Sequence, residues 1–127
     1  YEITYGDWSS DVCSSDLLTP ETHGLIDASM LGYMRPDAWI INVGRGGHIV
    51  TDDLVDALRA GRIGGAALDV TDPEPLPRNH PLLVLDNVTI APHLGSATEQ
   101  TRRQMAEMSV ENLLLGLFGQ PLRHEVR

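Results

Sequence analysis

The sequence predicts an α/β protein built around a parallel sheet. Short runs of apolar and β-branched residues recur along the chain, each bounded by glycine, proline or acidic turn residues. The expected order of elements is helix, strand, helix, strand, loop, strand and long helix. Parallel sheets of this kind bind ligands beyond the carboxyl ends of their strands, so that edge is where functional residues are expected.

Composition narrows the class of protein before any motif is considered. The chain has 127 residues and a net charge of −9, which argues against nucleic acid and anionic membranes as partners. Its apolar runs fall far short of the ~20 residues that span a bilayer, and no secretory signal is visible. A cytoplasmic location is therefore the expectation. The histidines show no metal-ligand spacing, so no metal site is predicted.

Residues 1–17 are predicted to be foreign to the protein. The segment has no hydrophobic period and crowds serine and aspartate around one tryptophan and Cys13. Back-translated, residues 7–17 resemble a common sequencing adapter read in one frame. We therefore expect residues 1–17 to be disordered and to contribute nothing to the fold.

The first elements after that segment are short. Residues 18–20 are expected to be the end of a strand that leads into a loop. Asp27 is a suitable N-cap for a short helix through Met34, which Pro36 then ends. Residues 38–43 form an apolar, β-branched run typical of a strand buried on both faces.

A helix is predicted to begin at Thr51 and to stop at Gly61. Two aspartates lie in its first turn, where the helix dipole favours acidic groups. Its apolar face is expected to consist of Leu54, Ala57 and Leu58.

Two further strands and a long helix complete the pattern. Strands are expected at residues 65–70 and 87–91, with a proline-rich loop between them. Ser96 and Glu99 have the spacing of a capping box, which predicts that the last helix begins at Ser96.

Arg45 is the first candidate for chemistry. It lies between glycines directly after the predicted strand at residues 38–43. A guanidinium binds a carboxylate through two parallel hydrogen bonds, and neighbouring glycines allow the backbone to approach a ligand. A surface arginine in a glycine-rich turn is an equally good interpretation of this motif taken alone.

Asp69 and Glu74 place two carboxylates at the end of the next strand and in the loop that follows. Pro73 and Pro75 fix φ on both sides of Glu74 and so restrict its direction. In isolation, a solvated loop acid is the simpler interpretation of Glu74, and a turn-forming aspartate is the simpler interpretation of Asp69.

His93 follows the third predicted strand and precedes the long helix. Imidazole is the side chain best suited to donate and accept a proton near neutral pH. A carboxylate beside it would favour the imidazolium and so make a general acid. A histidine that only satisfies a backbone group remains the alternative.

Taken together and in this order, the motifs INVGRGG, LDV, DPEPLP and APHLGSAT resemble the D-isomer-specific 2-hydroxyacid dehydrogenase family. The resemblance covers residues 18–127. It implies a Rossmann-like fold, with residues 18–96 as the C-terminal part of an NAD(P)-binding domain. Residues 97–127 would be a crossover helix and a tail that return to a substrate domain.

The resemblance also implies a role for each candidate. Arg45 would clamp the carboxylate of a 2-oxo acid and polarise its carbonyl, and His93 would donate a proton to the carbonyl oxygen. Glu74 would keep His93 protonated, and Asp69 would hold the nicotinamide carboxamide of NAD or NADP. Val43 and Gly95 would line the cofactor, and Ser96 would contact the substrate.

Within the family, the motifs look most like the glyoxylate/hydroxypyruvate reductase branch. A phosphoglycerate dehydrogenase-like enzyme and a dinucleotide-sensing, corepressor-like binding protein remain alternatives. The resemblance further implies a homodimeric parent enzyme. The glycine-rich pyrophosphate loop and most of the substrate domain are missing, so the 127-residue chain alone is expected to be inactive.

Overall fold

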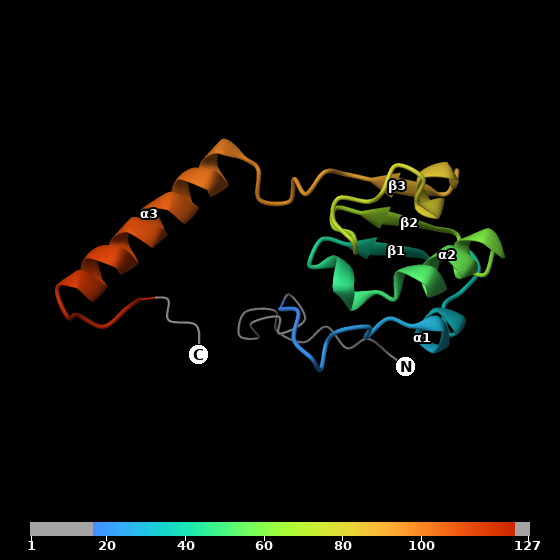
Figure 1. The fold of residues 1–127 in the computed structure, drawn as a ribbon, viewed down its shortest axis with the longest axis horizontal. Coiled ribbons are helices and arrows are strands. Elements are labelled where there is room, and N and C mark those ends of the chain that lie inside the picture. Colours follow the sequence, from blue (N-terminus) through green and yellow to red (C-terminus); the bar gives the residue numbers. More distant parts are fainter. Residues whose placement is uncertain (1–16, 124–127) are drawn as a thin grey trace. The chain divides into compact units, whose positions relative to one another are not determined.

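The computed structural model of the chain describes residues 17–123 (Figure 1). The predictions for residues 1–16 therefore lie outside the described residues. The chain divides after Pro92 into two compact units, Tyr1–Pro92 and His93–Arg127, and each is described by itself. The first unit contains a sheet with short helices, and the second contains one long helix.

A three-stranded parallel sheet forms the centre of the first unit. Its strands are β1 (Trp39–Asn42), β2 (Gly65–Leu68) and β3 (Val88–Ile90), in the spatial order β1-β2-β3. Ile41 lies opposite Ala67, and Ala67 lies opposite Thr89. The predicted α/β class with a Rossmann-like parallel sheet is thus confirmed, and each strand is two residues shorter than the sequence pattern indicated.

Two α-helices and two 3-10 helices accompany the strands. They are α1 (Ala28–Gly32), η2 (Gly46–His48), α2 (Thr51–Arg59) and η3 (Pro81–Val84). The helix α1 precedes β1, η2 and α2 lie between β1 and β2, and η3 lies between β2 and β3. Asp27 caps α1 as predicted, because its side chain accepts a hydrogen bond from the amide of Met30. The helix α2 begins at Thr51 as predicted, and Gly61 follows it with a φ of 64°.

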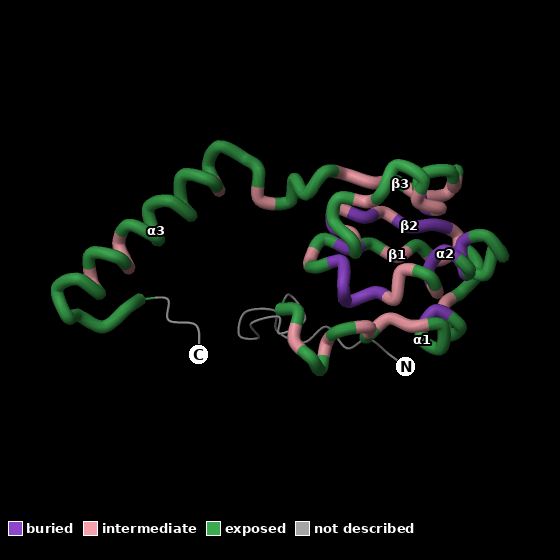
Figure 2. Tube along the Cα trace, viewed as in Figure 1, coloured by how far each residue is buried: buried purple, intermediate pink, exposed green. Residues whose placement is uncertain are grey.

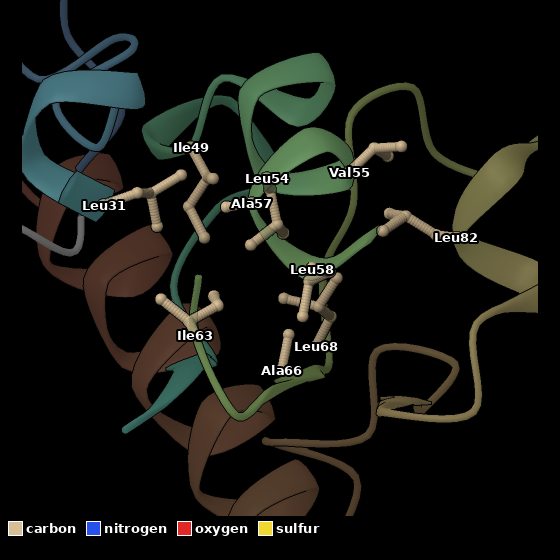
Figure 3. Packing of buried hydrophobic residues seen from close by; sticks show 10 residues of the cluster. All are labelled: Leu31, Ile49, Leu54, Val55, Ala57, Leu58, Ile63, Ala66, Leu68 and Leu82. Carbon is tan, nitrogen blue, oxygen red and sulfur yellow. The ribbon is translucent and has the colours of Figure 1, made fainter. Parts of the chain in front are cut away.

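The hydrophobic core lies on the face of the sheet that α2 covers. The predicted apolar face of α2 is confirmed, since Leu54, Ala57 and Leu58 are each 3% exposed or less. Figure 3 shows these side chains converging with residues from α1 and β2. The whole cluster comprises Leu31, Ile49, Leu54, Val55, Ala57, Leu58, Ile63, Ala66, Leu68 and Leu82.

The expectation that β1 is buried on both faces is wrong for this chain. Trp39 is 54% exposed and Ile41 is 70% exposed, whereas Ile40, between them, packs against the core. Alternate residues of a strand point to opposite faces, and α2 covers only one of them. β1 therefore has a buried face and an open one, which Figure 2 shows as a change of burial class along the strand.

The strand expected at residues 18–20 is also absent. The structure has a turn that begins at Pro20, and the hydroxyl of Thr22 accepts a hydrogen bond from the amide of Thr19. The backbone at residues 18–20 pairs with none of the three strands described above. An apolar residue beside a proline was too weak a pattern to distinguish a strand from a turn.

The second unit consists of α3 (Glu99–Leu117) and the residues on either side of it. The long helix was predicted, but its expected start at Ser96 was wrong. Thr98 is the N-cap, and its hydroxyl accepts a hydrogen bond from the amide of Thr101 at 3.1 Å. Both residues are good capping types, so composition alone did not choose between them.

Within residues 17–123, no helix is both long and apolar enough to cross a membrane.

Candidate active site

The candidate site begins at the carboxyl edge of the parallel sheet. The Arg45 segment follows β1, and Asp69 is the first residue after β2. Because β1 and β2 are adjacent and parallel, these two segments leave the sheet at the same edge. Val43 lies at that edge as well and is 69% exposed.

Arg45 lies in a tight loop between β1 and η2. Its backbone is extended, and its exposed guanidinium donates a hydrogen bond from Nη1 to the carbonyl of Gly44 at 2.8 Å. The carbonyl of Arg45 accepts hydrogen bonds from the side chain of Asn42 at 2.9 Å and from the amide of His48 at 3.3 Å. The backbone is therefore fixed while the charged group faces solvent, as a site for an anionic ligand requires.

Gly46 brings the Arg45 loop against the loop that carries Glu74. A Cβ atom at position 46 would collide with the carbonyl carbon and oxygen of Thr71. Real side chains do not approach backbone that closely, so only glycine fits at this position. The two loops are in direct backbone contact at this point.

The loop after β2 is held by two threonines. The hydroxyl of Thr51, at the start of α2, donates to the carbonyl of Asp72 at 2.9 Å. The hydroxyl of Thr71 donates to the carbonyl of Pro73 at 3.0 Å. Glu74 follows in an exposed position between two cis X-Pro peptide bonds, Asp72-Pro73 and Glu74-Pro75.

His93 belongs to the second unit, together with Gly95 and Ser96. Among residues 17–123, His93 is the non-glycine residue with a positive φ, at 55°. Such backbone is uncommon for residues with a side chain and is concentrated at functional sites and turns. The structure thus places Val43, Arg45, Asp69 and Glu74 in one unit, and the predicted contacts of His93, Gly95 and Ser96 with them stay predictions.

Asn42 is a residue of this region that the sequence reasoning missed. It ends β1, is only 9% exposed, and its side chain binds both Gly44 and Arg45. A signal existed in the sequence, because Asn42 is the one polar residue in the apolar run at residues 38–43. Polar groups are seldom buried without a specific partner, so a polar residue in that run indicated a specific contact.

The residues present at this edge fit a nicotinamide cofactor. Val43 offers exposed apolar surface beyond β1, and Asp69 offers a half-buried carboxylate beyond β2. A flat, largely apolar ring that carries a carboxamide needs both an apolar wall and a hydrogen-bond acceptor. No cluster of three or more metal-ligating side chains occurs among the residues that the structure describes.

The family model and the curated relatives that match this chain indicate the same family. The family model described as "D-isomer specific 2-hydroxyacid dehydrogenase, NAD binding domain" matches residues 8–95. That range begins inside the first seventeen residues, and their foreign origin stays a prediction. A glyoxylate reductase/hydroxypyruvate reductase of Homo sapiens is 49% identical over 110 residues, which is 87% of this chain and 34% of that protein.

Solved structures agree with this result. The TT0316 protein of Thermus thermophilus has a TM-score of 0.79 and 51% identity, over 87% of this chain and 35% of that one. An NADPH-dependent glyoxylate/hydroxypyruvate reductase of Sinorhizobium meliloti, solved with NADP and malonate, has a TM-score of 0.72 and 39% identity. That match covers 76% of this chain and 30% of the other. The chain spans about a third of the length of the curated relatives it matches.

Proposed function

The chain belongs to the D-isomer specific 2-hydroxyacid dehydrogenase family, as its motifs indicated, and we propose that the full-length protein reduces a small 2-oxo acid with NADH or NADPH. Glyoxylate and hydroxypyruvate are the proposed substrates, and the D-2-hydroxy acid is the proposed product. The observation that carries the proposal is the Arg45 loop, which meets the Asp69–Glu74 segment at the carboxyl edge of the sheet. The identity to glyoxylate/hydroxypyruvate reductases supports the choice of substrate.

The proposed roles follow from the chemistry of each side chain. Arg45 binds the substrate carboxylate and draws electron density from the adjacent carbonyl. His93 gives a proton to the carbonyl oxygen, and a bound NADH or NADPH would supply the hydride that the carbon needs. The role of Glu74 is to keep the imidazole protonated between turnovers. Asp69 orients the carboxamide of the nicotinamide ring, and Val43 and Gly95 line its surroundings, with Ser96 beside the substrate.

The test is steady-state kinetics on the full-length protein with glyoxylate, hydroxypyruvate and 3-phosphohydroxypyruvate, each with NADH and NADPH. Arg45→Ala and His93→Ala are each expected to lower kcat/KM by ~10²-fold or more, the scale of losing a charged clamp or a general acid. Arg62→Ala is the matched control, because Arg62 is exposed and lies before β2, at the opposite edge of the sheet.

The outcomes separate the competing functions. A His93→Ala enzyme with the kcat/KM of the parent would refute the role of His93 as proton donor. A strong preference for 3-phosphohydroxypyruvate would identify a phosphoglycerate dehydrogenase-like enzyme instead. Cofactor binding without turnover of any 2-oxo acid would indicate a dinucleotide-sensing protein, since that class needs the cofactor site but no reaction.

Glu74 has a test of its own, because its role is to change the protonation of another group. Glu74→Gln is expected to shift the fall of kcat/KM at alkaline pH toward lower pH, since an amide stabilises the imidazolium less than a carboxylate does. An unshifted pH profile with a lowered rate would show that Glu74 acts in some other way.

The 127-residue chain by itself is proposed to be inactive, since it spans about a third of the length of its relatives. Oxidation of NADPH with glyoxylate by this purified chain would overturn that proposal. We also propose that the full-length protein is a cytoplasmic homodimer without nucleic-acid or membrane partners. Sedimentation equilibrium on the purified protein tests the dimer, and fractionation of the source cells tests the location.

A further inference from the structure

We propose that Asn42 is a positioning residue that acts through Arg45, because its side-chain amide holds the backbone of the loop from which the guanidinium projects. This inference rests on the proposed function, in which Arg45 binds the substrate carboxylate. It gives a role to a residue of the INVGRGG motif to which the proposed function assigns none. Asn42 ends β1 and is 9% exposed, so its amide is directed into the protein and not toward solvent.

Both ends of the Asn42 amide bind the Arg45 loop. Nδ2 donates a hydrogen bond to the carbonyl of Arg45 at 2.9 Å, and Oδ1 accepts one from the amide of Gly44 at 3.1 Å. The backbone carbonyl of Asn42 also accepts a hydrogen bond from the amide of Asp69 at 2.9 Å. One residue therefore connects the segments that carry two of the proposed functional groups.

The loop needs such support because glycine flanks Arg45 on both sides. Glycine restricts the backbone less than any other residue, so the segment around Arg45 has little conformational preference of its own. The guanidinium is exposed, and its hydrogen bond goes to the carbonyl of the neighbouring Gly44. Its direction therefore depends on the backbone of Arg45, which Asn42 fixes from the side of the core.

An amide is the side chain that meets both requirements at once. The carbonyl of Arg45 needs a donor, and the amide of Gly44 needs an acceptor, at the two branches of one short side chain. A carboxylate would present a second acceptor to the carbonyl of Arg45 and repel it. The carbonyl of Arg45 would then keep only the longer hydrogen bond from the amide of His48, at 3.3 Å, beside a repelling carboxylate, so the loop is expected to move when Asn42 becomes aspartate.

The test uses Asn42→Asp in the full-length enzyme, both with Arg45 present and in an Arg45→Ala background. Asn87→Asp is the matched control. Asn87 is a partly buried asparagine that binds backbone carbonyls with its amide, and it lies before β3, at the opposite edge of the sheet. The same chemical change is thus made at both edges, and only one of them carries Arg45.

With Arg45 present, Asn42→Asp is expected to lower kcat/KM for the 2-oxo acid by about 10-fold to 100-fold, the scale of a small misplacement of a binding group. In the Arg45→Ala background the same substitution is expected to change kcat/KM by less than about 3-fold, because the group it positions is gone. Asn87→Asp is expected to leave kcat/KM within about 2-fold of the parent. Melting temperatures identify any variant that fails to fold, and Asn42→Ser, which keeps a shorter donor and acceptor, then replaces Asn42→Asp.

Three results would overturn the inference. Equal losses from Asn42→Asp with and without Arg45 would show that Asn42 acts independently of the guanidinium. An equal loss from Asn87→Asp would show a general effect of asparagine replacement on stability. An Arg45→Ala enzyme as active as the parent would refute the proposed function and the positioning role together, whereas the first result leaves the proposed function intact.

Discussion

The helices α2 and α3 differ in how each is stabilised. The nine-residue α2 buries Leu54, Val55, Ala57 and Leu58, whereas the nineteen-residue α3 buries no residue at all (Figure 2). An isolated helix as short as α2 is marginal in water, because nucleation is costly and each added residue contributes little. Most helical stability in proteins therefore comes from tertiary packing. The stability of α2 comes from its packing against the core, and α3 has no comparable support within its unit.

The surface of α3 shows what kind of support is missing. Large apolar side chains are exposed along it and just beyond its end: Met105, Met108, Val110, Leu113, Leu114, Leu117 and Phe118. Apolar surface on this scale favours burial against further protein. The prediction that α3 returns to a substrate domain would supply such a surface in the full-length protein. The two helices therefore differ in burial: α2 is packed within the chain, whereas the apolar side chains of α3 stay exposed.

The largest effect on stability is expected from a substitution that removes part of the packing of α2 against the core. Leu54 is 1% exposed, so Leu54→Ala is expected to lower the free energy of unfolding of the chain by about 3 kcal/mol, the usual cost of a buried cavity. Leu113 is 62% exposed, and Leu113→Ala is expected to change the free energy of unfolding by less than about 0.5 kcal/mol. Urea unfolding followed by circular dichroism measures both.

The same pair of variants sharpens the comparison in the full-length protein. If α3 is covered there, Leu113→Ala becomes clearly more destabilising than in the 127-residue chain, while Leu54→Ala keeps its effect. Equal losses of unfolding free energy from both substitutions in the 127-residue chain would contradict this difference between the helices, since they would mean that α3 is as well packed as α2.

A second prediction concerns the contact between the two loops of the candidate site. Gly46→Ala forces a Cβ against the backbone of Thr71 and is expected to destabilise the sheet unit by about 1–3 kcal/mol. Gly32→Ala is the control, because nothing lies within 4 Å of the added Cβ and Gly32 is in α1. Alanine favours helix over glycine, so this variant is expected to match or exceed the parent in thermal unfolding. A stable Gly46→Ala protein would mean that the loops are not in contact.

A smaller effect is expected at the start of α3, which has no packing to compensate for a lost cap. Thr98→Ala removes the hydroxyl that binds the amide of Thr101 and is expected to cost about 1 kcal/mol of helix stability. Ser96→Ala lies outside the helix and is expected to leave its helicity unchanged. Far-ultraviolet circular dichroism during thermal unfolding compares the two, and a larger loss from Ser96→Ala would restore the capping box as the start of α3.

The smallest effect is expected at the exposed ion pair of Arg35 and Asp37. The Arg35 guanidinium, 2.9 Å from the carboxylate, lowers the pKa of Asp37 below its usual range. The stability that this pair contributes is present above the pKa of the unfolded chain and is lost as pH falls through the lower, folded pKa. Because both side chains are more than two-thirds exposed, the contribution is small.

Asp37→Asn tests that contribution. The melting temperature of the variant is expected to lie slightly below that of the parent at neutral pH and to converge with it below the usual aspartate pKa of about 3.9. A difference that widens in acid would contradict the direction of the shift.

Local patterns were sufficient for the apolar face of α2 and the N-cap of α1, each of which depends on residues close together in the chain. Leu54, Ala57 and Leu58 recur at helical spacing, so their common burial followed from geometry alone. Asp27 caps α1 because its side chain reaches an amide three residues away. Where two elements meet, local patterns failed. The run containing Trp39 and Ile41 looks the same whether one face of its strand is covered or both, and the covering layer is not encoded in the run itself.

The sequence by itself determined the order of strands and helices, the family, and the position of Arg45 and Asp69 after adjacent strands, because these depend on periodicity and on residues close in the chain. Only the tertiary structure decided that Asn42 holds the Arg45 loop, that Gly46 must be glycine, and that β1 keeps one face open. Each of these depends on atoms that the fold brings together. Whether a side chain holds a loop, clashes with backbone or stays exposed depends on its neighbours in space. Separation along the chain does not specify those neighbours.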